Sequence, residues 1–599
     1  MSGIAGMVNL DGAPADRSIL VRLMESLTFR GPDGQGIWIE GVAGLGHTLL
    51  KTTDESDGEH QPLTVDGQVW IVADARIDAR RDLIAELRAR GHELAADVPD
   101  VELILRAYCV WQEECVEHLL GDFAFGIWDA PRRRLFCARD HMGVKPFFYA
   151  HLGRCVVFSN TLECVRRHPA VSDRLNDLAV ADFLLFDLNQ DKATTTFADI
   201  QRVPPAHSAT WSENGLRLRP YWTLPIDEPI FYRRHGDYVA HFHELLRAAV
   251  GDRLRTNRVG IFMSGGLDST TLAATAHDLL RDRSGNSGVR AFTIAGSDDE
   301  ERHYAGLVAE SLGISIEFED NTVGIDPEWF QTSFHTPEPV PWPTNLAAEW
   351  AYYQRMASYG RVVFYGEGVD NALGYEWRPY FAYLVRRRRY GRLIYDLLSH
   401  TVLHRRIPLP ALLRMVMRHQ PKEPPGRLFP DWFNPDFEGR LQLRARWEQR
   451  LVEPQSPHPI RPIAYRSFDI TAWQELSGGF DAERTRSLQE VRHPFLDLRL
   501  LRYLLAVPAV PWCRSKYLLR RAMRERLPKS VLRRPKTPLF HDPWTKRILE
   551  CGMPPLVPDP ALEPYVDSSR VPRVPVVPSF WTDFRTRSLN YWLRNLHHL

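Results

Sequence analysis

Ser264-Gly265-Gly266-Leu267-Asp268-Ser269-Thr270 lies between an apolar run, residues 259–263, and a helical pattern, residues 271–280. The two glycines let the backbone approach a ligand closely, and the N–H groups of the following helix point toward an anion in the turn. The loop lacks the Gly-Lys-Ser/Thr ending of a P-loop, whose lysine reaches the β- and γ-phosphates. The stretch therefore predicts a phosphate cradle, and an ordinary glycine turn is the alternative.

Strand and helix patterns alternate around this loop. The predicted strands are 259–263, 290–294, 315–319 and 362–365, and the predicted helices are 238–254, 271–280, 302–312 and 346–359. Such alternation predicts a parallel sheet with right-handed crossovers, whose ligands bind beyond the carboxyl ends of the strands. The loop Gly366-Glu367-Gly368-Val369-Asp370 follows the last of these strands, so it should face the same site. A dinucleotide fingerprint would need glycine at Asn371, which argues against NAD.

Residues 1–222 have a different texture. Short apolar or alternating runs at 69–72, 135–138 and 156–158 are broken by Gly, Asp and Pro, and helical patterns cover 19–27 and 101–119. This predicts an α+β region with antiparallel sheets. Two prolines flanked by acids at 224–229 mark a linker, so the predicted domains are 1–222 and 230–599.

An arginine- and aromatic-rich stretch at about 377–462 predicts a helical insertion in the second domain. Its run Arg386-Arg387-Arg388-Arg389 is more often a solvated helix face than a binding patch. A proline-rich tract at 554–578 should wrap the surface.

The bulk composition excludes several classes of partner. Lys plus Arg equals Asp plus Glu at 75 each in 599 residues, so no net field attracts nucleic acid or an anionic membrane. Seven cysteines without a Cys-x-x-Cys pair are typical of a reducing compartment. Neither a signal peptide nor a run of about 18 apolar residues is evident, which predicts a cytoplasmic protein.

Four motifs in order resemble the synthetase domain of the class II asparagine synthetases: SGGLDST at 264–270, GEGVD at 366–370, EVRHPFLD at 490–497 and SKYLLR at 515–520. The N-terminal region resembles the glutaminase domain of the same enzymes at SGIAG (2–6), RGPDG (30–34), GDFAF (121–125) and RDHMGVKP (139–146). The resemblance implies an Ntn-hydrolase-like α+β sandwich followed by an α/β parallel-sheet ATP-pyrophosphatase (PP-loop) domain.

Three departures from the family pattern concern the glutaminase. Ser2 stands where these enzymes use an N-terminal cysteine, and an N-terminal serine can still act as a nucleophile. The arginine that holds the glutamine carboxylate is replaced by Leu49 in the string His47-Thr48-Leu49-Leu50, and Ala73-Asp74-Ala75 replaces an Asn-Gly-Glu string. Losing both clamps removes the charge-assisted bonds that position glutamine. The resemblance therefore implies an inactive glutaminase that serves as scaffold.

This pattern resembles two branches of the family, the β-lactam synthetases and the lasso peptide macrolactam cyclases. The first branch usually has tyrosine where this chain keeps Glu367, so the cyclase branch fits better. The cyclase resemblance implies an AMP-forming ligase of ribosomal peptide (RiPP) biosynthesis, with a precursor peptide substrate, a leader-binding protein and a leader peptidase. Alternatives are an ammonia- or glutamine-dependent asparagine synthetase, a β-lactam synthetase-like enzyme and a catalytically silent scaffold or binding protein.

Roles follow for individual residues, with ATP and Mg²⁺ as the implied cofactors. Glu367 and Lys536 are the candidate catalytic residues, and Asp268 and Asp370 the candidate Mg²⁺ ligands. The candidate nucleotide-binding residues are Ser264, Gly265, Gly266, Leu267, Asp268, Ser269 and Gly366.

Plainer roles remain open for three of these residues. Asp370 could be a helix N-cap, Glu367 could pair with an arginine, and Lys536 could be a solvent-exposed lysine. Arg492, His493 and Asp497 should be structural parts of a helix start, and adenine should lie against strand 290–294.

Overall fold

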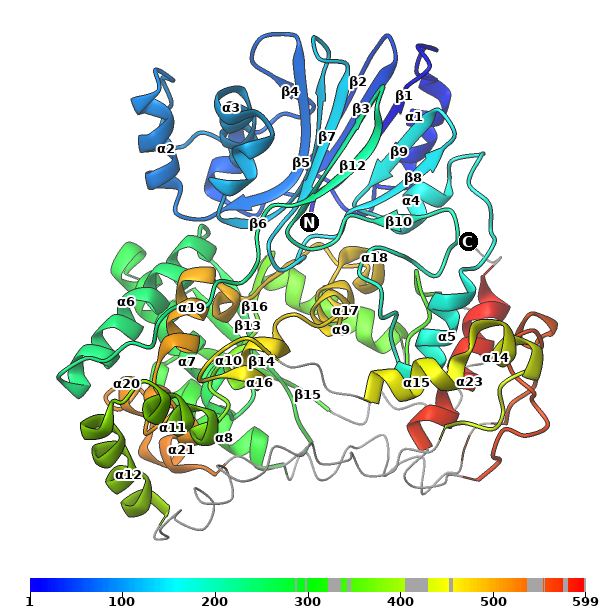
Figure 1. Ribbon diagram of the computed structural model, residues 1–599. Coiled ribbons are helices and arrows are strands. Elements are labelled where there is room, and N and C mark those ends of the chain that lie inside the picture. Colours follow the sequence, from blue (N-terminus) through cyan, green and yellow to red (C-terminus); the bar gives the residue numbers. More distant parts are fainter. Residues whose placement is uncertain are drawn as a thin grey trace.

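The computed structural model describes residues 1–285, 288–296, 299–320, 335–341, 346–404, 429–451, 456–535, 553, 555–574 and 580–596. Two units lie one above the other, an N-terminal sandwich and a C-terminal unit built on a parallel sheet (Figure 1). This is the predicted fold class, and the antiparallel and parallel character of the sheets is confirmed.

The N-terminal unit contains two six-stranded sheets in which neighbouring strands pair antiparallel. The first sheet has the order β10-β8-β9-β1-β3-β2, with β1 Gly3–Asn9, β2 Gly34–Glu40, β3 Ala43–Leu49, β8 Phe148–Leu152, β9 Cys155–Ser159 and β10 Gln201–Arg202. The second has the order β12-β11-β7-β6-β5-β4, with β4 Leu63–Thr64, β5 Val69–Ile77, β6 Gly121–Asp129, β7 Arg134–Arg139, β11 His207–Ser212 and β12 Gly215–Pro220.

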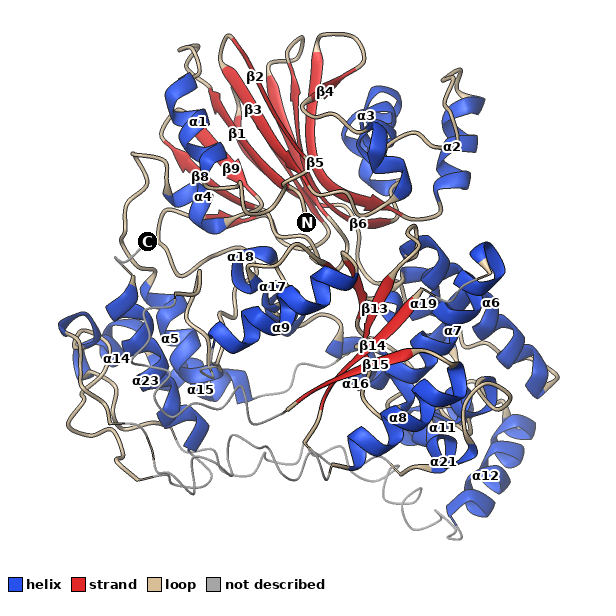
Figure 2. Cartoon of the chain, turned by 180° about the vertical axis from the view of Figure 1, so that it is seen from behind, coloured by secondary structure: helices blue, strands red, loops and turns tan. Residues whose placement is uncertain are grey.

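The two sheets pack face to face and carry helices on their outer faces (Figure 2). The helices on these faces are α1 Arg17–Glu25, α2 Arg80–Ala89, α3 Asp100–Trp111 and α4 Leu162–Arg166, whereas α5 Asp177–Phe186 lies below the sandwich (Figures 1 and 2). Gly6 and Gly126 lie on facing sheets, and a Cβ at either position would come within 2.4 or 2.5 Å of the Phe158 ring. Only glycine therefore allows that ring to fill the space between the sheets.

The helix predicted at 101–119 is shorter than expected. It ends at Trp111 because Gln112 adopts φ 54°, and a 3₁₀ helix, Gln112–Glu117, follows. A left-handed residue cannot continue an α-helix, which explains the break.

The C-terminal unit is built on a five-stranded parallel sheet of order β15-β14-β13-β16-β17. Its strands are β13 Val259–Phe262, β14 Val289–Ile294, β15 Ser315–Glu319, β16 Val362–Phe364 and β17 Glu490–Arg492. Strand β17 was not predicted, since two of its three residues are charged. Both charges are buried because Arg492 Nε donates to Glu490 Oε1 at 2.7 Å.

Helices cover both faces of this sheet, and their bounds near the predicted ones are α6 His235–Arg253, α7 Leu267–Ser284, α8 Glu300–Leu312 and α9 Leu346–Tyr359. After β17 come α19 Leu498–Ala506, α20 Tyr517–Ala522 and α21 Lys529–Arg533. Asp497 is the N-cap of α19, where its side chain accepts hydrogen bonds from the amides of Arg499 and Leu500, so its predicted structural role holds.

The described part of the region predicted as an insertion is mostly helical. It contains α11 Trp377–Arg386, α12 Tyr390–His404, α14 Pro435–Leu441 and α15 Leu443–Leu451, while α16 Pro462–Ser467, α17 Ala472–Gly479 and α18 Ala482–Thr485 lead toward β17. Helix α11 ends at Arg386, so Arg387, Arg388 and Arg389 form the exposed turn before α12 rather than a helix face.

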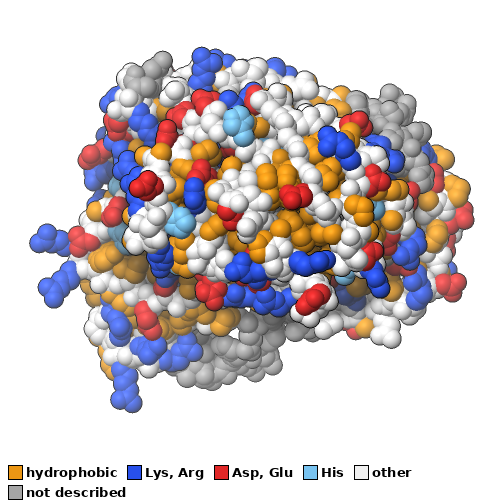
Figure 3. All heavy atoms as spheres, turned by 90° about the horizontal axis from the view of Figure 1, so that it is seen from above, with side chains coloured by type: hydrophobic (Ala, Val, Ile, Leu, Met, Phe, Trp, Pro, Cys, Tyr) orange, Lys and Arg blue, Asp and Glu red, His pale blue; other side chains and the backbone are white. Residues whose placement is uncertain are grey.

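The last described helix, α23 Phe580–Asn595, returns to the N-terminal unit and packs beside α5 (Figures 1 and 2). Trp592 of α23 and Phe197 share one apolar cluster with α5. Seen from the end of the N-terminal unit, Lys and Arg side chains are interspersed with Asp and Glu side chains and with hydrophobic ones (Figure 3). Within the described residues, every helix is too short or too polar to cross a lipid bilayer.

Candidate active site

The two predicted loops meet at the carboxyl ends of β13 and β16. A Cβ added to Gly366 would lie 3.1 Å from the backbone N of Ser269, so these two loops are in backbone contact. Gly368 has φ 107°, and a Cβ there would lie 2.8 Å from Leu496 Cδ2. A side chain at Gly366 would therefore push the two loops slightly apart, and Gly368 is favoured both by close approach and by its backbone conformation.

The cradle is held open by its own side chains. Ser269 Oγ donates to the Ser264 carbonyl at 3.1 Å, and Gly266 N donates to Ser264 Oγ at 3.2 Å. Gly265 N donates to Glu301 Oε2 at 2.7 Å, and Gly266 is the N-cap of α7. Two of the predicted amides thus bind protein acceptors in this structure, and the start of α7 supplies the positive end of a helix dipole beside them.

Lys516 joins the two loops through their acidic residues. Its Nζ lies 2.5 Å from Asp268 Oδ2 and 2.7 Å from Asp370 Oδ1. Asp268 is in the first turn of α7, and Asp370 is in the first turn of α10 Val369–Ala372. The N-cap of α10 is Gly368, so the alternative reading of Asp370 as an N-cap is wrong.

Asp268 occupies a carboxylate-rich environment. Its pKa is raised to about 6, mainly by burial and also by the carboxylates of Asp370 and Glu367, while Lys516 opposes the shift. Its second oxygen, Oδ1, is buried and accepts no hydrogen bond from the described residues. Among the described residues, the carboxylates of Asp370 and Glu367 and the cations of Lys516 and Arg520 all act on Asp268. One or two carboxylates plus phosphate oxygens are the usual Mg²⁺ environment, so Asp268 and Asp370 fit this ion.

The loop that carries Lys516 has an unusual backbone. Ser515 and Lys516 both have positive φ, at 47° and 56°. Such conformations persist in non-glycine residues only when surrounding contacts hold them, and they cluster at functional sites. Sequence reasoning included Lys516 in a family motif but assigned it no role. The feature that could have identified it is its place in a motif that follows the parallel-sheet strands. Only the fold, however, brings Lys516 to Asp268.

The second predicted catalytic residue, Lys536, lies outside the described residues, which end at residue 535 in this segment. The chain before it is fixed beside the cradle, because Arg534 Nη2 donates to Glu301 Oε1 at 3.0 Å. The guanidinium of Arg534 also lies 4.5 Å from the centre of the Tyr304 ring.

The predicted adenine surface ends in an exposed apolar residue. Ile294, the last residue of β14, is 54% exposed although the residues before it are buried. After β16, Tyr365 packs against Phe480 and the edge of His493, with ring centres 4.9 and 6.0 Å apart. Burial lowers the pKa of His493 to about 4, so this ring is neutral and structural, as predicted.

The predicted glutamine pocket contains a buried ion-pair cluster. Lys145 Nζ lies 3.0 Å from Asp74 Oδ1 and 3.3 Å from Glu490 Oε2, and the three side chains are at most 6% exposed. Burial lowers the pKa of Lys145, but Asp74 and Glu490 outweigh it and raise the pKa overall. Ser2 Oγ accepts a hydrogen bond from Leu50 N at 3.0 Å, and Leu49 is buried.

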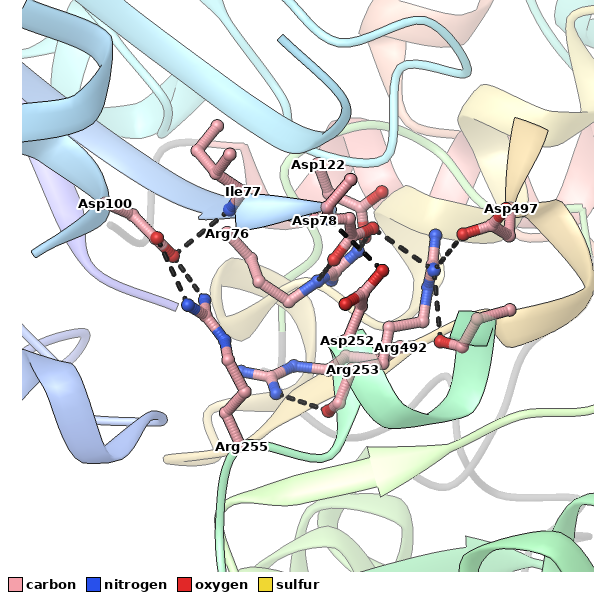
Figure 4. Close-up of polar contacts among 12 residues, drawn as sticks. Arg76, Ile77, Asp78, Asp100, Asp122, Asp252, Arg253, Arg255, Arg492 and Asp497 are labelled. Atoms are coloured by element: carbon pink, nitrogen blue, oxygen red, sulfur yellow. Dashed lines mark hydrogen bonds and ion pairs between the residues drawn. The ribbon is translucent and has the colours of Figure 1, made fainter. Parts of the chain in front are cut away.

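Further buried charges connect the two units (Figure 4). Arg253, at the end of α6, lies 2.8 Å from Asp497 and 3.1 Å from Asp78 of the N-terminal unit. Arg255 pairs with Asp100 at the start of α3. Because breaking a buried pair strands an uncompensated charge, these contacts fix how the units sit against each other.

Comparisons with known proteins agree with this division. A glutamine amidotransferase domain model matches residues 1–222, and an asparagine synthase model matches residues 241–574. Asparagine synthetase [glutamine-hydrolyzing] 3 of Bacillus subtilis is 34% identical over 281 residues, which cover 46% of this chain and 45% of that protein. Putative asparagine synthetase 2 of Methanocaldococcus jannaschii is 29% identical over 326 residues, covering 49% of this chain and 59% of that protein.

A putative asparagine synthetase of Mycobacterium tuberculosis is 27% identical over 605 residues, covering 89% of this chain and 85% of that protein. The chain spans about half the length of the Bacillus subtilis and Methanocaldococcus jannaschii relatives that it matches.

Proposed function

This chain belongs to the asparagine synthase family, and on that premise we propose that it is an ATP-dependent ligase that forms an amide through an acyl adenylate. The observation that carries the proposal is the position of Lys516 between Asp268 and Asp370, beside the amide-lined cradle at the start of α7. Such a site stabilises phosphate charge without a P-loop lysine, which suits the departure of pyrophosphate.

The first step activates a carboxylate. An oxygen of the substrate carboxylate attacks the α-phosphorus of ATP, the bond to the bridging oxygen of the β-phosphate breaks, and pyrophosphate leaves. Amides at the start of α7 and the ammonium of Lys516 would hold the pyrophosphate charge. Mg²⁺, when held by Asp268 and Asp370, would supply further neutralisation of the phosphate oxygens.

The second step forms the amide. The substrate amine attacks the acyl carbon, the bond between that carbon and the AMP oxygen breaks, and the amine loses a proton. Glu367 is the proposed acceptor of this proton, since it precedes Gly368 in the same loop as Asp370. Lys536 is proposed to stabilise the charged intermediates, as its match to the family string implies, and Ile294 is proposed to contact adenine.

We further propose that the amine is the N-terminal amine of a precursor peptide and that the carboxylate is an Asp or Glu side chain, so that the product is a macrolactam. Support comes from the pocket that would otherwise hold glutamine, because Asp74 there binds Lys145 and Leu49 offers no charge to a carboxylate. Retention of Glu367 favours this branch over a β-lactam synthetase.

The surface of the insertion supports a peptide substrate. Arg386 to Arg389 are exposed, and the adjacent helix α12 exposes Tyr390, Ile394, Tyr395 and Leu398. Aromatic and arginine side chains provide stacking and charge for extended peptides. A leader-binding protein and a leader peptidase are the proposed partners, and a reducing cytoplasm is the proposed location.

An ammonia- or glutamine-dependent asparagine synthetase is the second candidate, because the Bacillus subtilis and Methanocaldococcus jannaschii relatives are named as glutamine-hydrolyzing asparagine synthetases. Mass spectrometry of products distinguishes the two. The cyclase converts the precursor peptide to a product about 18 Da lighter, because one water is lost per amide, and forms one AMP for each ring closed. The asparagine synthetase instead forms AMP when it is given only aspartate and ammonium.

ATP–pyrophosphate exchange tests the adenylation step itself. Exchange that depends on the carboxylate substrate supports the ligase, and formation of ADP or absence of nucleotide turnover with every substrate refutes it in favour of a silent scaffold. Incubation with glutamine tests the scaffold role of the N-terminal unit, since release of glutamate would contradict it.

A further inference from the structure

Arg520 connects two segments that border the candidate site. Its Nε donates to the Ser515 carbonyl at 2.6 Å, its Nη2 donates to the Arg534 carbonyl at 2.9 Å, and its Nη1 donates to the Leu532 carbonyl. A guanidinium carries five donors in a fixed plane, so it can set the distance between several carbonyls in a way that a lysine cannot.

The side chain of Arg534 continues this connection to the phosphate loop. Glu301 accepts from Arg534 with one carboxylate oxygen and from the amide of Gly265 with the other. The packing is close, because a Cβ added to Gly265 would lie 2.7 Å from Arg534 Nη1 and 2.6 Å from Tyr304 Cβ. Arg534 therefore connects the phosphate loop to the segment that precedes Lys536.

Lys516 completes this set of contacts at the C-terminal end of the phosphate loop, where Asp268 lies. Its backbone follows Ser515, whose carbonyl is held by Arg520, and its ammonium binds Asp268. The result is a closed ring of contacts around the cradle, and its members are Gly265, Glu301, Arg534, Arg520, Ser515, Lys516 and Asp268.

We propose that Arg520 and Arg534 are positioning residues that hold Lys516 and the segment entering Lys536 in register with the phosphate loop. The proposal rests on the proposed function, which gives these groups their chemistry. Ser515 and Lys516 have positive φ, so the loop needs outside contacts to keep Lys516 in place. Misplacement of a reacting group by about 1 Å can cost roughly 100-fold in rate, which makes such a ring consequential.

Arg520→Lys and Arg534→Lys test the ring, with Arg521→Lys as the matched control. Arg521 is the next residue on α20 and is exposed. The measurements are kcat and the KM for ATP in ATP–pyrophosphate exchange, together with the urea midpoint of unfolding. The expected result is a fall in kcat of about 10- to 100-fold for both ring variants, with a much smaller change in KM, and wild-type values for the control.

Glu301→Gln provides a second measurement, at a side chain that is 33% exposed. It keeps an acceptor for the Gly265 amide but removes the charge that binds Arg534. Combined with Arg534→Lys, it should lower kcat no further than either single variant, because both break the same link.

The two hypotheses fail in different ways. An active wild type whose ring variants lose urea stability but keep their kcat per folded molecule overturns the positioning role alone. A wild-type kcat in both Arg520→Lys and Arg534→Lys would also overturn the positioning role alone. A wild type without exchange refutes the proposed function, and the positioning role with it.

Discussion

Lys145 Nζ lies 3.3 Å from Glu490 Oε2, so a lysine of the N-terminal unit neutralises a carboxylate in the edge strand of the parallel sheet. Arg492 binds the other oxygen of the same carboxylate at 2.7 Å. The two charges hold the pKa of Glu490 well below its usual range although burial acts in the opposite direction. The N-terminal unit thus contacts the sheet that carries the candidate site through a buried ion pair.

Lys145→Met should destabilise the protein strongly. Removing the ammonium takes the ion-pair partner from buried Asp74 and leaves buried Glu490 to its arginine neighbours, which should lower the free energy of unfolding by about 3–5 kcal/mol in urea titrations. Lys192→Met is the matched control, because Lys192 pairs with Asp469 on the surface and its loss should cost no more than about 1 kcal/mol. Equal effects of the two substitutions would contradict the interface described above.

Asp268→Asn should abolish ATP–pyrophosphate exchange, because the carboxylate is both a partner of Lys516 and a proposed Mg²⁺ ligand. We expect a loss of at least about 100-fold in rate. Asp282→Asn on the same helix removes a carboxylate that is exposed and paired with Arg247, and it should leave exchange unchanged. Exchange at the wild-type rate in Asp268→Asn would remove this residue from the site.

Lys516→Met should also lower exchange, since it removes the positive charge between two carboxylates. The substitution should raise the pKa of Asp268 further, because Lys516 is the group that opposes the shift. The rate should fall by about 100-fold, and the acidic limb of its pH profile should move to higher pH. Lys529→Met, at an exposed position on α21, is the control; a profile that does not move in Lys516→Met argues against the pairing.

Exchange should rise with pH through about 6, where Asp268 becomes ionised. Stability should change in the opposite sense. The carboxyl group titrates near 3.8 in a model peptide and near 6 in the native protein, so the native state binds more protons between these values. Its contribution to stability is present below pH 3.8 and is lost as pH rises through 6. Urea titrations of the wild type and Asp268→Asn between about pH 4 and 7 should show that the wild type loses this stability with rising pH and the variant does not.

Gly368→Ala should impair both folding and exchange. A Cβ at this position meets Leu496 at 2.8 Å, and φ 107° is strained for any L side chain. The cost should be about 1–3 kcal/mol of unfolding free energy, and displacement of the loop should reduce exchange more than stability alone explains. At Gly374 a Cβ would meet only Asn371 O at 3.6 Å, so Gly374→Ala should be tolerated; similar losses in both variants would contradict this account.

The sequence predicted the parallel sheet because β13 and β14 are short, apolar and separated by helical periods. It missed β17, since hydrophobic pattern cannot identify a strand of three residues with two charges. Those charges become acceptable only when Lys145, Arg492 and Glu490 meet, and that meeting depends on contacts between residues more than 300 positions apart.

The site divides in the same way. Asp268 and Asp370 could be identified from the sequence because each follows a strand in a glycine-containing loop, and parallel strands end at one edge. Lys516, Glu301 and Arg534 could not, because local pattern does not state which distant side chain completes a charge balance. Local periodicity and turn chemistry act over a few residues and could therefore be identified from the sequence. The pairing of buried charges is decided by three-dimensional distance, since Coulomb energy and desolvation depend on separation and burial rather than on order in sequence.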